Sequence, residues 1–501
     1  MKLFIAALVA GASVASSGAL AQDALPQAGS PWFKVGQDTL AANLAKQPNT
    51  RRAKNIILFT ADGQGVGTNY AVRLFSGQQK GLLGSEYVQP QEAFPHLALV
   101  KTYTTNGQTP DSAPTAGAMN TGVKQKNGMI NIDPSVAHGD CAGVTGHELK
   151  TFAEIVAGEG KSVGVVSTAR ITHATPAGVY AKTANRDWED DSKLPEGCTA
   201  QKDIAAQLFD QIKAGVVDIA LGGGRRHFLP KDVKGEEGKS GKRTDGRNII
   251  KEIQDLGGQY AWNEDTFKAL DLDSDKPVIG LFEASHMKYE ADRTGEPSLA
   301  EMTAAAIKKL SKNGNGFYLD IEAGRVDHAN HDGNGARMLT DGKAFADAIA
   351  LADEMTDDAD TLIIVTADHE HAIAFNGYCG RGSPINGLCY DVDGKGEKHA
   401  AAPLLADDGK PYTVIGYLNG VGSVLKKQDD GTYSGSRPAI DEEIVEDKDY
   451  VQQALIPLSS ETHSGEDVAV YAKGPWSHLF DGTVEQNYIF HVMNHAAHNG
   501  E

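Results

Sequence analysis

Six short apolar runs are spaced along the chain, and apolar residues recur at helical intervals in the stretches between them. The runs cover residues 55–60, 162–167, 217–221, 317–321, 361–366 and 468–472. Their length and composition favour buried strands. Between them, helical spacing covers 148–157, 202–214, 298–310 and 342–352. This alternation predicts an α/β fold whose central, largely parallel sheet carries helices on both faces.

One region departs from this alternation. Residues 376–448 are rich in Gly, Asp and Lys, and only 412–418 is a good strand candidate. We expect a loop-rich, crown-like insertion that caps or flanks a functional site. The rest of residues 22–501 is predicted to form one α/β domain, with the insertion inside it.

The first residues have the pattern of a signal peptide. Lys2 is followed by an apolar stretch over 3–14, and Ala19-Leu20-Ala21 has the form of a cleavage site. We therefore expect residues 1–21 to direct export to the periplasm or the exterior. The stretch is shorter than the roughly 20 residues that a membrane span needs, and no later segment qualifies.

Charge and cysteine content narrow the function further. The formal net charge is −20 without an evident basic stripe, so a nucleic acid is not expected as a specific partner. Four cysteines in an exported chain favour disulfides. Their spacing suggests Cys379 with Cys389 and Cys141 with Cys198, although sequence alone allows three connectivities.

Acidic residues stand where three predicted strands end. Asp62 closes the first strand, Glu322 follows the fourth, and Asp368-His369 closes the fifth. Ligands of open α/β sheets gather at such strand ends, so these side chains are expected to converge. Each carboxylate could instead cap a helix after its strand. Capping alone is a poor explanation for three strands that end in the same way.

Histidines extend this set into a predicted metal centre. Asp327 and His331 are four residues apart and would share one side of a helical turn. Mixed oxygen and nitrogen donors suit zinc, whereas the hard oxygen of Glu322 suits magnesium. Such a cluster could also be a solvated turn if it stood alone. His463 is the candidate for a last imidazole ligand, and His371 for a partner that orients a ligand.

A nucleophile and an anion clamp are predicted near these residues. Ser112 lies where a loop enters a helix, and the helix N-terminus favours an alkoxide or a phosphate. Asp111 or Ser112 could instead be a simple helix cap. Arg186 offers a planar fork for two phosphoryl oxygens, and Asp111 could orient it.

Taken in order, these motifs resemble the secreted alkaline phosphatase family from about residue 55 to residue 475. The matching segments are Asp62-Gly63, Asp111-Ser112-Ala113, His173-Ala174-Thr175-Pro176, Asn185-Arg186, Glu322-Ala323-Gly324-Arg325-Val326-Asp327-His328, Thr366-Ala367-Asp368-His369 and Thr462-His463-Ser464-Gly465. His173 and His328 are similar to the animal and marine bacterial branch, because the best-known bacterial pattern has Asp and Lys there.

The resemblance implies hydrolysis of phosphate monoesters to alcohol and phosphate at alkaline pH, through a phosphoserine at Ser112. It implies two zinc ions and one magnesium ion, a phosphate clamp at Arg186, and a homodimer. The implied zinc ligands are Asp327, His331 and His463 for one ion, and Asp368, His369 and Ser112 for the other. Asp62 would bridge to a magnesium ion held by Glu322 and Thr175, near His173.

The sequence fits other hydrolase classes and a non-catalytic role less well. A phosphodiesterase would have little use for a clamp that grips a doubly charged phosphate, and a sulfatase needs a C-x-P-x-R that is absent. A non-catalytic metal or phosphate binder has no need of Ser112.

The G-x-S-x-G letters at 160–164 lack the strand–Ser–helix order of a hydrolase elbow. The acidic run at 271–275 lacks the Gly and Glu of a calcium loop. The histidines near the C-terminus favour a terminal helix over a metal site.

Overall fold

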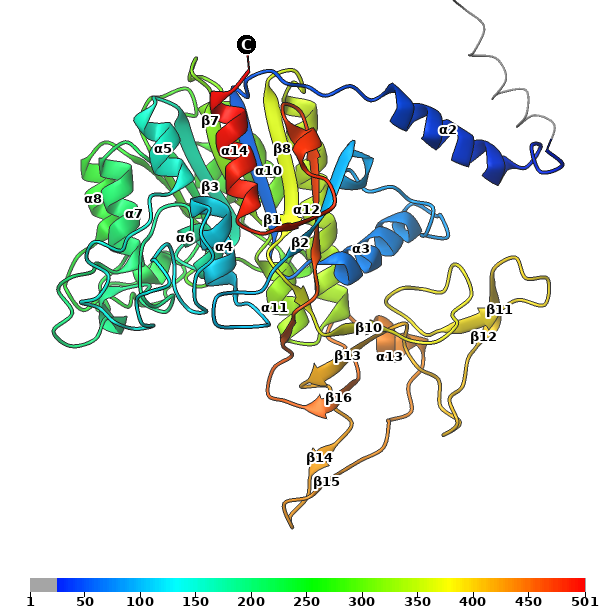
Figure 1. The fold of residues 1–501 in the computed structure, drawn as a ribbon. Helices are drawn as coiled ribbons and strands as arrows, with labels where there is room; N and C mark the ends of the chain where they lie inside the picture. The colour runs from blue at the N-terminus through cyan, green and yellow to red at the C-terminus, as the bar shows by residue number, and fades with distance from the viewer. Residues whose placement is uncertain (1–24, 501) are drawn as a thin grey trace, which may run out of the picture. The chain divides into compact units, whose positions relative to one another are not determined.

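In residues 25–500, which the computed structural model describes, ten strands form the central sheet in the order β19–β2–β18–β8–β1–β7–β3–β4–β6–β5 (Figure 1). Their bounds are β1 Asn55–Ala61, β2 His96–Lys101, β3 Ser162–Arg170, β4 Ile219–Gly223, β5 Gln259–Ala261, β6 Val278–Leu281, β7 Phe317–Glu322, β8 Thr361–Ala367, β18 Val468–Lys473 and β19 Thr483–Glu485. All six predicted strands are present. Within the described sheet only β18 runs antiparallel to its neighbours, β2 and β8, so the predicted fold class is confirmed.

Both faces of the sheet are buried, because alternate residues of each strand feed separate cores. Ile56 and Leu58 of β1 pack into one core, and Ile57 and Phe59 into the other. The first core is covered by α4 Ser112–Thr121, α5 Phe152–Gly158, α7 Ile204–Lys213, α8 Ile249–Asp255 and α14 Tyr488–His498. The second is covered by α3 Val66–Gln79, α10 Leu299–Leu310, α11 Arg325–His331 and α12 Gly335–Met355.

Caps explain where the helices differ from the prediction. α5 begins four residues later than expected, because Thr151 and Glu154 form a capping box. α12 begins seven residues earlier than expected, where the Asn334 side chain accepts from Arg337 N–H. The prediction did not include α3 or β2. The expected terminal helix is α14. The G-x-S-x-G letters at 160–164 overlap the start of β3, so a strand follows Ser162 and the order of a hydrolase elbow is absent.

The region at 376–448 carries small sheets rather than one strand. It contains β11 Tyr390–Val392, β12 His399–Pro403, β13 Ile415–Gly420, β14 Lys426–Lys427, β15 Tyr433–Ser434 and α13 Glu442–Glu446. β13 pairs with β10 Ile373–Phe375 and with β16 Ala454–Pro457, and the β11–β12 and β14–β15 hairpins project beyond this sheet (Figure 1). Both suggested disulfides are present, Cys141–Cys198 and Cys379–Cys389.

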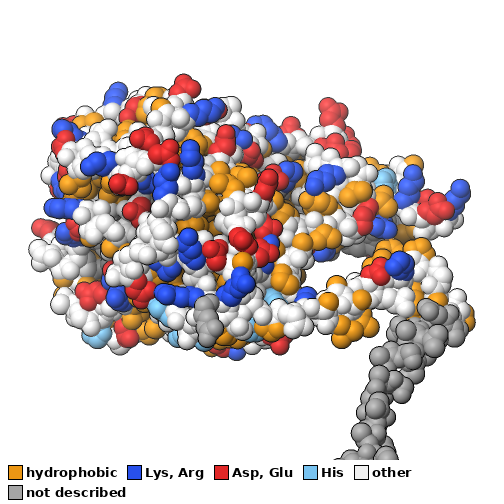
Figure 2. Space-filling model, turned by 90° about the horizontal axis from the view of Figure 1, so that it is seen from above, with side chains coloured by type: hydrophobic (Ala, Val, Ile, Leu, Met, Phe, Trp, Pro, Cys, Tyr) orange, Lys and Arg blue, Asp and Glu red, His pale blue; other side chains and the backbone are white. Residues whose placement is uncertain are grey.

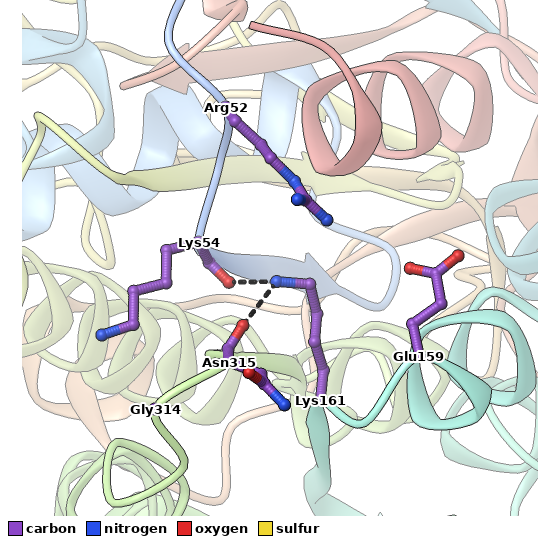
Figure 3. Close-up of a pocket in the computed structure, with 6 residues that line it drawn as sticks. All are labelled: Arg52, Lys54, Glu159, Lys161, Gly314 and Asn315. Carbon is purple, nitrogen blue, oxygen red and sulfur yellow. Dashed lines mark hydrogen bonds between the residues drawn. The ribbon is translucent and has the colours of Figure 1, made fainter. Parts of the chain in front are cut away.

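At the amino-terminal ends of β1, β3 and β7, a buried lysine links the three strands by hydrogen bonds. Lys161 directly precedes β3, and its Nζ donates to the carbonyl oxygens of Lys54 (2.7 Å) and Asn315 (2.8 Å). Those two residues lie just before β1 and β7. Lys161, Arg52 and Glu159 line a pocket of about 400 Å³, and Figure 3 shows these side chains. Burial and the charge of Arg52 lower the pKa of Lys161 to about 8.

The described part of residues 1–48 forms a separate unit. It contains α2 Pro31–Ala45, and none of the residues in this helix is buried. The predicted signal peptide at 1–21 lies outside the described residues. No helix within 25–500 is both long and apolar enough to cross a membrane. In the view of Figure 2, acidic and basic side chains are intermixed over the surface rather than gathered by sign.

Candidate metal centre

The sheet brings the three predicted carboxylates together at the carboxyl ends of β1, β7 and β8. β1 pairs in parallel with both β7 and β8, so that Thr60 lies opposite Glu322 and Ala61 opposite Ala367. Asp62 and Asp368 follow these aligned positions, and the amide of Gly63 donates to Asp368 Oδ1 at 3.1 Å. All three carboxylates are fully buried.

Ser112 faces this group from the start of α4. Its Oγ lies 3.1 Å from Asp62 Oδ1 and 3.1 Å from His369 Nε2. Asp111 caps α4 by accepting from the Ala113 N–H at 2.8 Å, so the helix begins at Ser112. The hydroxyl therefore stands at the positive end of α4, beside a carboxylate and an imidazole.

A second group surrounds Asp327 on α11. Asp327 Oδ1 lies 3.3 Å from His331 Nε2, 3.0 Å from His371 Nε2 and 3.2 Å from His463 Nε2. His463 reaches this point because β17 His463–Ser464 pairs with β9 Glu370–His371, which places His463 opposite His371. His331 and His463, which are 132 positions apart, therefore share one oxygen.

Hydrogen bonds to the backbone fix which imidazole nitrogens face each other. His331 Nδ1 donates to the carbonyl of Glu461 (2.6 Å), and His463 Nδ1 donates to that of Pro110 (2.8 Å). In the neutral rings both Nε2 atoms then carry lone pairs, yet they lie 3.1 Å apart. Two lone pairs and a carboxylate oxygen converge here, which is the donor set that a zinc ion requires.

His369 has the same arrangement at the other group. Its Nδ1 lies 3.3 Å from the carbonyl of Glu370 and donates to it, so the Nε2 lone pair faces Asp62 Oδ1 (3.1 Å) and Asp368 Oδ2 (3.5 Å). An imidazole lone pair that faces two carboxylates needs a cation between them. The residues therefore fit a second metal ion.

His371 is bound differently. Its Nε2 lies 3.0 Å from Asp327 Oδ1 and its Nδ1 lies 2.6 Å from Glu461 Oε2. Contact with two carboxylates, which outweighs burial, raises the pKa of His371 well above its usual value. A ring protonated at both nitrogens would donate to both carboxylates and so hold Asp327 in place.

A third group lies on the far side of Asp62. Asp62 Oδ2 is 3.5 Å from Thr175 Oγ1. Glu322 Oε2 accepts from the Ser167 hydroxyl, while its Oε1 is buried without a hydrogen-bond partner. Asp62, His173 and Glu322 offer ligand atoms within 4.8 Å of one another. Buried oxygens with unused lone pairs suit a hard cation such as magnesium.

Burial shifts the pKa values of the site residues in a way that favours bound cations. It raises the pKa of Asp62 to about 7, with repulsion from Asp327 adding to the effect. The pKa of Asp368 also rises to about 7, through burial and then through Asp62. Burial lowers the pKa of His463 to about 4. Carboxylates that resist ionisation and imidazoles that resist protonation are together best stabilised by bound cations.

Arg186 lies between two residues of the predicted site. Its Nη1 donates to Asp111 Oδ1 at 2.9 Å, and its Nη2 lies 3.0 Å from His173 Nε2. Its backbone N–H donates to the carbonyl of Gly128 at 2.8 Å, and Gly128 N–H donates to Asp111 in turn. The guanidinium is thus held in one orientation beside the N-terminus of α4.

The sequence interpretation assigned no role to three residues at this centre. Glu461 holds His371, and Glu370 lies between His369 and His371. The His286 ring centroid lies 3.9 Å from that of His328, with His173 beside them. Glu461 directly precedes the Thr462-His463-Ser464-Gly465 segment, and its position beside a predicted ligand was the available signal. His286 lies in the loop after β6, and its spacing gave no signal.

Comparisons with known proteins agree on one family. The family model for alkaline phosphatase matches residues 53–499. An alkaline phosphatase of Gadus morhua is 41% identical over 488 residues, covering 94% of this chain and 97% of that protein. The tissue-nonspecific alkaline phosphatase of Gallus gallus is 40% identical, covering 93% of this chain and 89% of its own.

Solved structures show the same fold. The alkaline phosphatase of Thermus thermophilus has a TM-score of 0.62 at 22% identity and covers 92% of this chain and 94% of its own. A cold-active alkaline phosphatase of Shewanella sp. has a TM-score of 0.61 at 21% identity and covers 88% and 99%. At these identities the likeness concerns the fold alone.

Proposed function

Because the chain belongs to the alkaline phosphatase family and hydrolyses phosphate monoesters, we propose that Ser112 is its nucleophile. The observation that carries this proposal is the position of Ser112 Oγ, 3.1 Å from both Asp62 Oδ1 and His369 Nε2. Oγ forms a bond to phosphorus as the bond to the leaving alcohol breaks, which leaves a phosphoserine. Water then cleaves the Oγ–P bond and releases phosphate.

Arg186 is proposed to bind two oxygens of the transferred phosphoryl group. Its planar fork matches a phosphate, and its contacts with Asp111 and His173 hold that fork before substrate arrives. A terminal phosphate with two charges gains most from this clamp. The arrangement therefore favours monoesters over diesters.

The centre is proposed to hold two zinc ions and one magnesium ion. Asp327, His331 and His463 would hold one zinc, and Asp62, Asp368 and His369 the other, beside Ser112. Asp62, Glu322 and Thr175 would hold magnesium, with His173 nearby and His328 behind it. When bound, such cations supply charge that stabilises the phosphoryl-transfer transition state. A His-to-Asp variant of the TAB5 alkaline phosphatase, which shares this fold, was solved with Mg bound in its M3 site.

Export and dimerisation complete the proposal. The two disulfides fit an exported protein, and we propose that residues 1–21 direct it to the periplasm or the exterior.

We also propose a homodimer that buries the apolar residues of the β10–β13–β16 sheet. Leu418 of β13 and Leu455 of β16 lie side by side on it and are 55% and 61% exposed.

The experiment that tests the nucleophile is Ser112→Ala. We expect turnover of a phosphomonoester at alkaline pH to fall by at least about 10³-fold, because the covalent route is lost. Zinc and magnesium contents and Tm should remain near those of the wild type. Full activity in this variant would remove Ser112 as the nucleophile. Parallel assays with a phosphodiester and a sulfate ester distinguish the alternative hydrolases.

A further inference from the structure

Glu370 is a buried carboxylate that stands between two histidines of the metal centre but faces away from it. It is 5% exposed. Its Oε2 accepts from the N–H groups of Gly67 (2.7 Å) and Thr68 (3.1 Å). Its Oε1 accepts from the Thr68 hydroxyl (2.6 Å) and from the N–H of His371 (3.1 Å). Four donors therefore fix one carboxylate.

These contacts supply the cap that α3 lacks. The N-cap residue of α3 is Gly65, which has no side chain to accept from the first N–H groups. Gly67 and Thr68 lie in the first turn of the helix, and Glu370 accepts from both. A carboxylate at this end of the helix is also favoured by the helix dipole. The cap thus comes from β9, about 300 residues further along the chain.

The segment between Asp62 and α3 lies against the same two residues. A Cβ at Gly63, whose φ is +71°, would come within 2.3 Å of His371 Nε2. A Cβ at Gly65 would come within 2.7 Å of the Glu370 Cβ. Only glycines allow this approach. The position of Asp62 is therefore set on one side by β1 and on the other by the contact of α3 with Glu370.

We propose that Glu370 is a positioning residue that holds the Asp62 segment against His369 and His371, and so sets the metal affinity of the two groups that share Asp62. The inference rests on the proposed function. The Asp327–His331–His463 group contains no ligand on this segment and is expected to depend less on Glu370.

The test compares Glu370→Ala with the wild type by dialysis against increasing chelator, with zinc and magnesium measured by mass spectrometry. We expect one zinc and the magnesium to be retained about 10- to 100-fold less tightly, as is typical when a partner behind a ligand is removed. The remaining zinc should be retained as in the wild type. Glu370→Gln keeps an acceptor for Gly67 and Thr68 and should give an intermediate result.

Asp218→Ala is the matched control, since Asp218 accepts from Val163 N–H at 2.8 Å at the opposite end of the sheet. It should lower Tm without changing metal retention. If Glu370→Ala does not fold, Thr68→Val removes one hydrogen bond and should weaken the same two ions more mildly. Equal loss of all three ions, or unchanged retention, would overturn the inference. A wild type that binds no ions would count against the proposed function instead.

Discussion

At the scale of single residues, backbone carbonyls decide what the site can bind. The carbonyls of Glu461, Pro110 and Glu370 each accept from an Nδ1–H, and so aim three Nε2 lone pairs at carboxylates. His371 differs from these three rings, because it has a carboxylate at both nitrogens. Histidine side chains thus take different roles according to whether Nδ1 donates to a backbone carbonyl or to a carboxylate.

The phosphate clamp gives a prediction at this scale. Arg186→Ala should weaken inhibition by inorganic phosphate about 10- to 100-fold, because two charge-assisted hydrogen bonds are lost. KM for a phosphomonoester should rise with it, and steady-state kinetics with phosphate as competitor would measure both. Arg247→Ala is the control, since Arg247 pairs with Glu252 on the surface. Unchanged phosphate affinity in Arg186→Ala would refute the clamp.

At the scale of elements, α4, which carries Ser112, is anchored to the sheet by a buried polar network. The Tyr318 hydroxyl of β7 lies 2.9 Å from Asn120 Oδ1 of α4 and 2.9 Å from Asp320 Oδ2. One O–H cannot donate to both. If Asp320 is protonated, it donates to Tyr318, which then donates to Asn120. Burial favours that form and raises the pKa of Asp320 to about 7.

A pH dependence of stability follows from this network. Asp320 has a pKa of 3.8 when unfolded and about 7 when folded, so the folded state binds more protons between these values. Its contribution to stability is therefore complete below pH 4 and is lost as pH rises through 7. Asp320→Asn mimics the protonated acid and should be more stable than the wild type at pH 8 by on the order of 3 kcal/mol.

Urea unfolding of the two metal-free proteins at pH 4.5 and pH 8 would measure this difference. The gap should shrink to about 1 kcal/mol at pH 4.5, because only the unfolded Asp320 is ionised there. An equal gap at both pH values would mean that Asp320 does not titrate as described.

At the scale of the whole molecule, the carboxyl ends of β1, β7 and β8 carry the candidate metal centre, and the β10–β13–β16 sheet carries exposed apolar residues. Leu418→Asp combined with Leu455→Asp should convert a homodimer into monomers, because two charges would then be buried in the interface. Analytical ultracentrifugation would measure the mass. Leu256→Asp, at an exposed apolar position on the C-cap of α8, is the control and should leave the mass unchanged. A monomeric wild type, or dimers in both variants, would refute this interface.

Much of the fold could be read from the chain before its structure was known. The six apolar runs became β1, β3, β4, β7, β8 and β18, since strands buried on both faces need continuous apolar sequence. The disulfide pairs followed from cysteine spacing. The sequence did not predict α3 or the sheet strands β2, β5, β6 and β19. β5, β6 and β19 have only three or four residues, and α3 is rich in glycine and polar residues. The 376–448 region was expected to have one strand and has several.

The sequence by itself determined the α/β class, the alkaline phosphatase family and the residues able to bind metal, because apolar periodicity and local motifs depend on residues that are close in sequence. Only the tertiary structure decided how those residues are used. Parallel register brings Asp62 beside Glu322 and Asp368, and β9 supplies the cap of α3. Hydrogen bonds to residues 130 and 353 positions away orient the rings of His331 and His463, and such contacts leave no periodic trace in sequence.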